Sequence, residues 1–259
     1  MHSLMPSIFL AHGSPFLLDD RRWVSELATW ALALPRPKAI LVISAHWVVR
    51  PVTLGATRTM PLVYDFYGFP RKYYAVTYPA PGAPALAQRV RECLSPSRPV
   101  ASDESRGLDH GAYVPLVAMY PAADVPVLQL SIPTMDPREL LEVGRALAPL
   151  RREGCLLVGS GFLTHNLHVV DWAPEAKTPA WAREFDDWIK DVLARRDVEA
   201  FVRYRERAPS VQTALPTHEH FVPVAISLGS SIDLPEERTT FPIEGFAYGA
   251  FTKRSVQFG

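Results

Sequence analysis

Cysteine is scarce in this chain: Cys93 and Cys155 are the only two, and they lack CxxC spacing. A disulfide scaffold and a thiolate metal site are therefore poorly supported, and the reducing cytoplasm is the expected compartment. Long hydrophobic runs are also missing, because no apolar stretch reaches the roughly 20 residues of a membrane-spanning helix. The residues before the first expected strand are too few for a signal peptide. We therefore expect a cytoplasmic protein that is not inserted in a membrane.

An excess of charge of either sign is absent as well. Lys plus Arg and Asp plus Glu both number 27, so no overall electric field attracts nucleic acid or an anionic membrane. The 48% hydrophobic and 21% charged residues are ordinary for a globular protein. The length predicts a single domain over 1–259 with a small molecule as its partner. The sequence leaves the oligomeric state open between a monomer and a small homo-oligomer.

Continuous apolar runs alternate with helical patterns along the chain. The runs at 7–11 and 39–45 are typical of parallel strands covered on both faces, and 20–34 between them has helical spacing. Further strands are expected at 125–132 and 155–159, helices at 83–94, 137–150, 181–195, 198–207 and 221–228, and a closing hairpin or edge strands at 244–252 and 255–258. The predicted fold is α/β, a central mixed and largely parallel sheet flanked by helices.

Histidines recur where an apolar run gives way to a small or polar residue. Neutral imidazole is the commonest metal ligand and the readiest acid or base near neutral pH. The carboxyl ends of neighbouring parallel strands share one edge of a sheet, where ligands bind. We therefore expect a metal site at one edge of the sheet. The histidines in question are His12, His46, His165 and the pair His218 and His220, which flank Glu219.

Several catalytic motifs are missing: GxGxxG, GxxxxGK[ST], GxSxG and HExxH. Phosphate-loop binding, acyl transfer by serine and the zinc-protease pattern therefore have no support. Two or three neutral imidazoles, with or without a carboxylate, suit Fe(II) for oxygen chemistry or Zn(II) for hydrolysis, and ligand type alone does not separate these. Asp109 precedes His110 and is a candidate to orient its ring, although groups brought together by folding do so more often.

Aromatic residues concentrate in 60–81, a segment without clear periodicity that we interpret as a pocket wall or lid. Flat aromatic side chains stack on flat substrates. Simple core packing is the competing interpretation for any one of them. The candidates for substrate contact are Trp47, Tyr64, Phe66 and Tyr67.

Taken together, these motifs resemble those of the DOPA-type extradiol ring-opening dioxygenases of class III, the protocatechuate 4,5-dioxygenase superfamily. They occur in the family's order from His12 to about Gly249, and the aromatic motif from Tyr64 to Pro70 is quite specific. The motifs are Ala11-His12-Gly13-Ser14-Pro15, Ile43-Ser44-Ala45-His46-Trp47, Tyr64-Asp65-Phe66-Tyr67-Gly68-Phe69-Pro70, Leu108-Asp109-His110-Gly111-Ala112-Tyr113, Gly159-Ser160-Gly161 through His165-Asn166-Leu167, and Pro216-Thr217 through His220.

The resemblance implies one non-haem divalent metal ion per chain, with Fe(II) for activity and Zn(II) as an alternative bound species. It places His12, His46 and His220 at metal-ligand positions, and His165 either as a further ligand or as a catalytic base. It places His110 at a catalytic position that contacts substrate or oxygen. This chain has His218 where relatives often have proline.

The reaction that the resemblance implies is the opening of a catechol ring, DOPA or similar, beside its diol with O2 to give a muconic semialdehyde. One alternative is a zinc-dependent hydrolase on the same histidines, which would need Glu219 or Asp109 as a general base near the metal. A second alternative is a non-catalytic binding protein of the same fold. A binding protein has no chemical need for the histidines, so their presence speaks against it.

Overall fold

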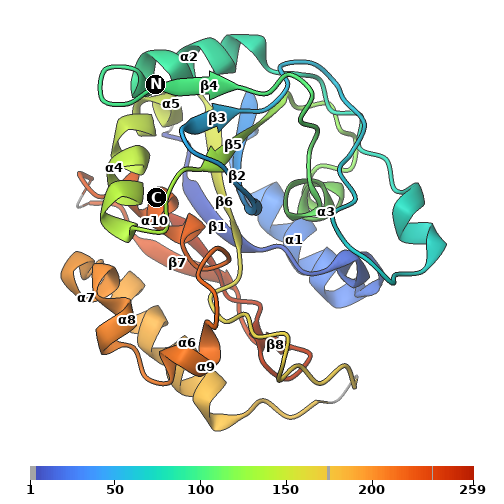
Figure 1. The fold of residues 1–259 in the computed structure, drawn as a ribbon, viewed down its shortest axis with the longest axis vertical. Helices are drawn as coiled ribbons and strands as arrows, with labels where there is room; N and C mark the ends of the chain where they lie inside the picture. Colours follow the sequence, from blue (N-terminus) through green and yellow to red (C-terminus); the bar gives the residue numbers. More distant parts are fainter. Residues whose placement is uncertain (1–3, 174–175, 235) are drawn as a thin grey trace.

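An eight-stranded mixed β-sheet runs through the molecule in the computed structural model, which describes residues 4–173, 176–234 and 236–259 (Figure 1). Its strand order is β4-β3-β5-β2-β6-β1-β10-β7. The strands are β1 (Ser7–Ala11), β2 (Ala39–Val48), β3 (Val52–Leu54), β4 (Val100–Ser102), β5 (Val127–Ile132), β6 (Cys155–Gly161), β7 (Thr239–Ile243) and β10 (Ser255–Phe258). A separate antiparallel pair consists of β8 (Phe246–Ala247) and β9 (Phe251–Thr252).

The centre of the sheet is parallel. Strand β6 pairs in parallel with β1 and with β2, and β2 pairs in parallel with β5. Strands β10 and β7 continue the sheet in antiparallel fashion beyond β1, and β3 is antiparallel to β5. This arrangement confirms the predicted mixed, largely parallel sheet within a single α/β domain.

Helices cover both faces of the sheet (Figure 1). They are α1 (Arg21–Ala33), α2 (Pro84–Leu94), α3 (His110–Met119), α4 (Pro137–Leu147), α5 (Pro149–Arg152), α6 (Ala180–Ala194), α7 (Val198–Val202), α8 (Tyr204–Arg207), α9 (Val211–Ala214) and α10 (Pro223–Gly229), with 3-10 turns η1 (Pro15–Asp19) and η2 (Arg71–Ala75). Successive strand residues point to opposite faces. In β1, Ile8 and Leu10 therefore pack in one core with α1 and α3, whereas Phe9 packs in the other with α4 and α10.

The structure departs from the sequence prediction at several elements. Helix α3 was not expected, because it is buried on nearly every side and contains Pro115, so it shows no amphipathic period. Strand β10 is not an edge strand, since it lies between β1 and β7. The helix expected at 137–150 is interrupted before Pro149, and the one expected at 198–207 is interrupted at Arg203. The short strands β3 and β4 and the edge strand β7 were also not predicted.

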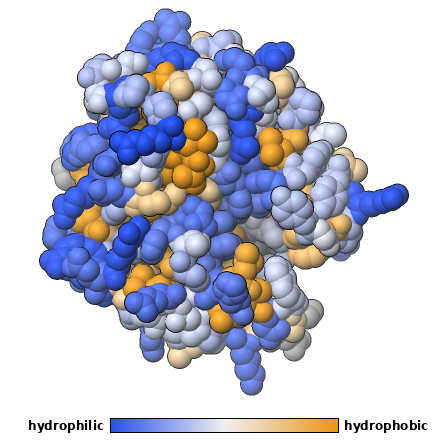
Figure 2. Space-filling model, viewed as in Figure 1, coloured by the Kyte–Doolittle hydropathy of each residue, from blue (hydrophilic) through white to orange (hydrophobic). Residues whose placement is uncertain are grey.

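The face of the molecule in Figure 2 is mostly hydrophilic, and its apolar side chains stand in small separate groups. Among the described residues, no helix is long and apolar enough to cross a membrane. Both cysteines are free, and Cys155 is buried at the start of β6. The segment before β1, on which the expectation about a signal peptide depends, lies partly outside the described residues, which begin at residue 4.

Candidate metal centre and active site

The carboxyl ends of the central strands bring two of the predicted histidines together. His12 directly follows β1, and its backbone N donates to the carbonyl of Gly161 at the end of β6. His46 lies two residues beyond Ser44, the last residue of β2 that pairs with β6. Their Nε2 atoms are 3.2 Å apart. The sheet edge therefore places them as neighbours, as the parallel topology predicts.

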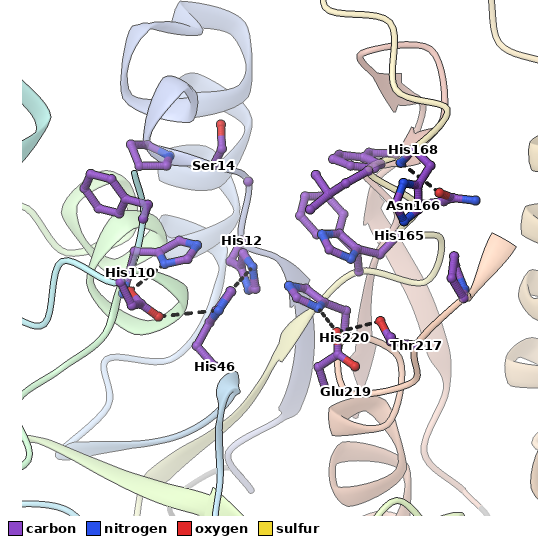
Figure 3. Close-up of a pocket in the computed structure, with 18 of the residues that line it drawn as sticks. His12, Ser14, His46, His110, His165, Asn166, His168, Thr217, Glu219 and His220 are labelled. Atoms are coloured by element: carbon purple, nitrogen blue, oxygen red, sulfur yellow. Dashed lines mark hydrogen bonds and ion pairs between the residues drawn. The ribbon is translucent and has the colours of Figure 1, made fainter. Parts of the chain in front are cut away.

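His165 and His220 reach the same place from loops. The backbone N of Phe162 donates to the His220 carbonyl at 2.9 Å, which ties the segment before α10 to the end of β6. A side chain at Gly161 would collide with that carbonyl, so this close approach requires glycine. The His165 and His220 rings stack at 3.6 Å between centres, with 10° between their planes. Figure 3 shows both rings across the cavity from His110.

His110 enters the site at the first position of α3. Asp109 caps this helix by accepting from the backbone N of Ala112, and it also pairs with the Arg106 guanidinium at 2.9 Å. Burial raises the pKa of Asp109 above its ordinary value. A side chain at Gly111 would collide with the Ser44 hydroxyl. The first turn of α3 can therefore lie directly against His12 and His46 because residue 111 is glycine.

Nδ1 of His12 and Nδ1 of His220 each lie within hydrogen-bond distance of a side-chain oxygen. The Ser160 hydroxyl donates to the Gly111 carbonyl at 2.5 Å, so it accepts from His12 Nδ1 at 2.9 Å. Glu219 accepts from His220 Nδ1 at 3.0 Å (Figure 3). With the proton at Nδ1, each ring presents an unprotonated Nε2, which is the arrangement that metal-binding histidines use.

The Asp65 carboxylate contacts the rings of both His110 and His46. Asp65 Oδ1 accepts from His110 Nδ1 at 2.7 Å, and Asp65 Oδ2 lies 3.4 Å from His46 Nδ1. Burial by itself would raise the pKa of Asp65, but the hydrogen bond from His110 and the two nearby imidazoles lower it to about 2. Asp65 is therefore ionised at neutral pH, is hydrogen-bonded to Nδ1 of His110, and places its second oxygen beside Nδ1 of His46.

His12, His46 and His220 are candidates to hold one divalent metal ion, because their rings lie close together. The Nε2 atoms of His12 and His46 are 3.2 Å apart, close enough to share a proton or to bind one cation between them. Nitrogens that share one ion at about 2.1 Å, with an angle of about 90–110° between them, are about 3.0–3.4 Å apart. The three ring centres are separated by 5.0, 5.3 and 4.8 Å, so all three rings are close enough to bind the same ion.

Two further imidazoles lie beside this triangle. The ligand atoms of His12, His46 and His110 all fall within 4.8 Å of one another, and those of His165, Glu219 and His220 form a second such group. Parallel stacked rings direct their lone pairs side by side, however, so His165 and His220 do not converge on one ion as stacked.

Burial favours the neutral form of four imidazoles, those of His12, His46, His165 and His220. Burial and the neighbouring imidazoles lower the pKa of His12 and of His220 well below the ordinary value. Burial, followed by the charge of His110, lowers the pKa of His46 to about 3, and burial lowers the pKa of His165 to about 4. The site is consequently uncharged at these positions at pH 7, which leaves the nitrogens free to bind a cation.

A cavity of about 520 Å³ opens onto the histidines. Phe66 lines it, as predicted, but the other three aromatic candidates do not. Trp47 follows His46 in β2 and so points away from it, beneath the Arg106 guanidinium. Tyr64 donates its hydroxyl to the Val76 carbonyl, and Tyr67 is 91% exposed. Phe69, from the segment expected to form a pocket wall, also lines the cavity, and the lining aromatic residues that the sequence did not indicate are Phe162, Trp172 and Phe251.

Two acidic residues differ from their expected roles. Asp109 does not orient the His110 ring, because its carboxylate is turned toward Arg106, Gln129 and the helix start. Asp65 does so instead, from 45 residues away in the sequence. One feature of the sequence could have identified Asp65, because it is the only acidic residue in 60–81.

Of the pair in the C-terminal segment, His220 faces the other imidazoles, whereas the ring of His218 packs against Tyr204, 5.5 Å between centres. His168 is exposed and also lines the cavity.

An α/β sheet whose strand ends bring several imidazoles together is the arrangement that a non-haem metal centre requires. Residues 7–257 match the family model for the catalytic LigB subunit of aromatic ring-opening dioxygenase. The chain is 40% identical to the 4,5-DOPA dioxygenase extradiol of Escherichia coli (strain K12), over 98% of this chain and 95% of that protein. It is 39% identical to the protein of the same name from Beta vulgaris, over 88% of each.

The crystal structure of an uncharacterized protein from Escherichia coli K12 matches with a TM-score of 0.83 and 38% identity, and the match covers 98% of this chain and 100% of that one. The chain therefore belongs to the family of aromatic ring-opening dioxygenases, and it is an extradiol dioxygenase. Its reactants are an aromatic substrate and O2, and its reaction uses a catalytic non-haem metal.

Proposed function

We propose that this enzyme opens the ring of a catechol such as DOPA beside its diol, with O2, to give a muconic semialdehyde. The observation that carries the proposal is that Nδ1 of His12 and Nδ1 of His220 each face an oxygen acceptor, which would leave Nε2 of these rings, with Nε2 of His46, to hold one Fe(II) ion. Four relatives, including those from Escherichia coli and Beta vulgaris, are named 4,5-DOPA dioxygenase extradiol.

The chemistry that Fe(II) supplies when bound is passage of electron density from the catechol ring to dioxygen, which makes a spin-forbidden reaction feasible. His110 would accept a phenolic proton at Nε2, because Asp65 already holds its Nδ1. The Asp65 carboxylate stabilises the imidazolium that results. His110 would return the proton as the ring opens.

His165 lies on the other side of the cavity, stacked on His220. Burial lowers its pKa to about 4, so the free enzyme keeps it neutral. We propose that it acts as a neutral hydrogen-bonding partner and secondary proton carrier next to the metal rather than as a fourth ligand. Phe66 and Phe69, which lie 5.1 Å apart between ring centres, form an apolar wall against which the substrate ring can pack.

Hydrolysis on the same site is less well supported by the structure. The two carboxylates that could serve as its general base already have other partners: Glu219 accepts from His220 and Thr217, and Asp109 is buried against Arg106. Membership of an enzyme family likewise favours catalysis over a binding protein. We further propose that 1–259 acts as one catalytic domain in the cytoplasm, where its two free cysteines would remain thiols.

The first test is anaerobic reconstitution of the purified protein with Fe(II), followed by DOPA and oxygen. We expect a yellow semialdehyde absorbance to rise together with oxygen uptake in a one-to-one ratio. A parallel sample loaded with Zn(II) should take up no oxygen, because zinc has no accessible redox change. Bound iron without oxygen uptake across DOPA, 4-methylcatechol and protocatechuate would refute the proposed reaction.

The charges around the cavity bear on which side chain the catechol carries. Among the described residues that line the cavity, no lysine or arginine occurs, and the two acidic ones, Asp65 and Glu219, are paired with imidazoles. His168 is the exposed histidine at the mouth. A substrate carboxylate would therefore meet His168 together with neutral donors such as Ser14 and Asn166.

The second test compares catechols with and without a carboxylate. We expect His168→Ala to raise the KM for DOPA by about 1.5- to 5-fold, the effect of losing one exposed polar contact, and to leave the KM for 4-methylcatechol unchanged. His168→Arg should lower the KM for DOPA, because a guanidinium is charged and can bond a carboxylate through two N–H groups. If the KM changed equally for both substrates, His168 would not bind the substrate carboxylate.

A further inference from the structure

Asp65 is held beside the first turn of α3 by the backbone of its own loop. The backbone N of Val63 donates to the Leu108 carbonyl at 2.8 Å, and Val63 forms a parallel bridge with Asp109. This pairing aligns the two segments so that residue 65 follows alongside residue 110. The Asp65 side chain is 23% exposed and lines the cavity, so it is neither a surface charge nor a core residue.

Both carboxylate oxygens of Asp65 have partners in the site. Oδ1 accepts from the backbone N of His110 at 3.1 Å and from its Nδ1 at 2.7 Å. Oδ2 lies 3.4 Å from Nδ1 of His46. The two imidazoles themselves are 3.9 Å apart between ring centres, so a shift of one ring displaces the other.

We propose that Asp65 is a positioning residue that sets the orientation and tautomer of His46 and His110 together. It couples a proposed metal ligand to the histidine proposed to carry the substrate proton, and in that respect the inference rests on the proposed function. With the proton of each ring directed at Asp65, both Nε2 atoms point into the cavity. Groups that hold ligating histidines in this way typically change metal affinity about 10- to 100-fold.

The variant Asp65→Asn distinguishes the positioning of His46 and His110 by Asp65 from simple packing. The asparagine has the same size and can still accept from His110 through its oxygen. Its amide nitrogen would then face His46 Nδ1, and two donors cannot bond to each other. His46 must therefore move its proton to Nε2, where that proton competes with a metal ion. Asp65→Ala removes both contacts and serves as the second variant.

Asp19→Asn is the matched control. Asp19 anchors the same aromatic segment from its other end, by accepting from Lys72 at 2.6 Å and from the Tyr73 hydroxyl, but these partners are not histidines. Removing its charge tests whether loosening the segment is enough to change the site. Circular dichroism and thermal melting verify that all three variants fold.

The measurement is zinc affinity in competition with a chromophoric chelator, without substrate or oxygen. We expect the dissociation constant to rise about 10- to 100-fold in Asp65→Asn and at least as much in Asp65→Ala, and to stay at the wild-type value in Asp19→Asn. Wild-type affinity in Asp65→Asn would overturn the proposal. An equal loss in Asp19→Asn would overturn it too, because segment placement alone would then explain the effect.

Nitrogen-15 NMR of the metal-free protein tests the proposed role of Asp65 independently of zinc affinity. In the wild type, His46 and His110 should both carry their proton on Nδ1, and in Asp65→Asn His46 should change to the Nε2 tautomer. If His46 keeps its Nδ1 proton in the variant, Asp65 does not set the tautomer and the proposal fails. If the wild type binds no zinc, the proposed metal site fails, and the tautomers still decide the role of Asp65.

Discussion

Alanine at His12 or His46 is expected to abolish retention of the metal ion. Each substitution removes one of the facing Nε2 atoms, so the remaining donors no longer surround a common point. Losing only the partner of a ligand costs about 10- to 100-fold in affinity, and we expect loss of the ligand itself to exceed that. Metal content after gel filtration, measured by mass spectrometry, should fall from one ion per chain to background, together with oxygen uptake.

The control for these variants is His218→Ala. His218 comes from the same segment as His220 but packs against Tyr204 instead of the imidazole cluster. Its removal should leave metal content at one ion per chain and oxygen uptake unchanged. If His12→Ala retained a full equivalent of metal under the same conditions, the triangle of His12, His46 and His220 would not be the binding site.

His110→Ala should have a different effect: the protein should retain its metal ion but lose turnover. A proton carrier positioned by a carboxylate contributes about 10²- to 10⁴-fold to a rate, so kcat should fall by that factor while the metal content stays near one ion per chain. His165→Ala should act in the same direction with a smaller loss, because burial keeps His165 neutral. Steady-state oxygen uptake at saturating DOPA provides the measurement.

A comparison of all four variants tests whether metal binding and proton transfer belong to different histidines. Equal loss of metal from the His12, His46, His110 and His165 variants would mean that the imidazoles act as one undivided ligand set. Full activity in His110→Ala, on the other hand, would move the proton-carrying role to another group in the cavity. Both outcomes are read from the same two measurements, metal content and kcat.

The sequence was most informative where a local pattern had one physical explanation. Strands β1, β2 and β6 were predicted because continuous apolar runs, such as 39–45, suit strands covered on both faces. Helix α3 was not, because burial on nearly every side erases the amphipathic period that identifies a helix. Strands β3 and β4 are three residues each, too short to show a pattern of their own.

The sequence by itself determined the α/β class, the family and the histidines at the strand ends, since these depend on composition, alternation and motif order. The tertiary structure decided which side chains act together. Asp65 meets His110 across 45 residues, Tyr67 turns to solvent, and the ring of His220 rather than His218 faces the other imidazoles. Such relations depend on loop paths and ring orientations, which long-range packing fixes and no local pattern encodes.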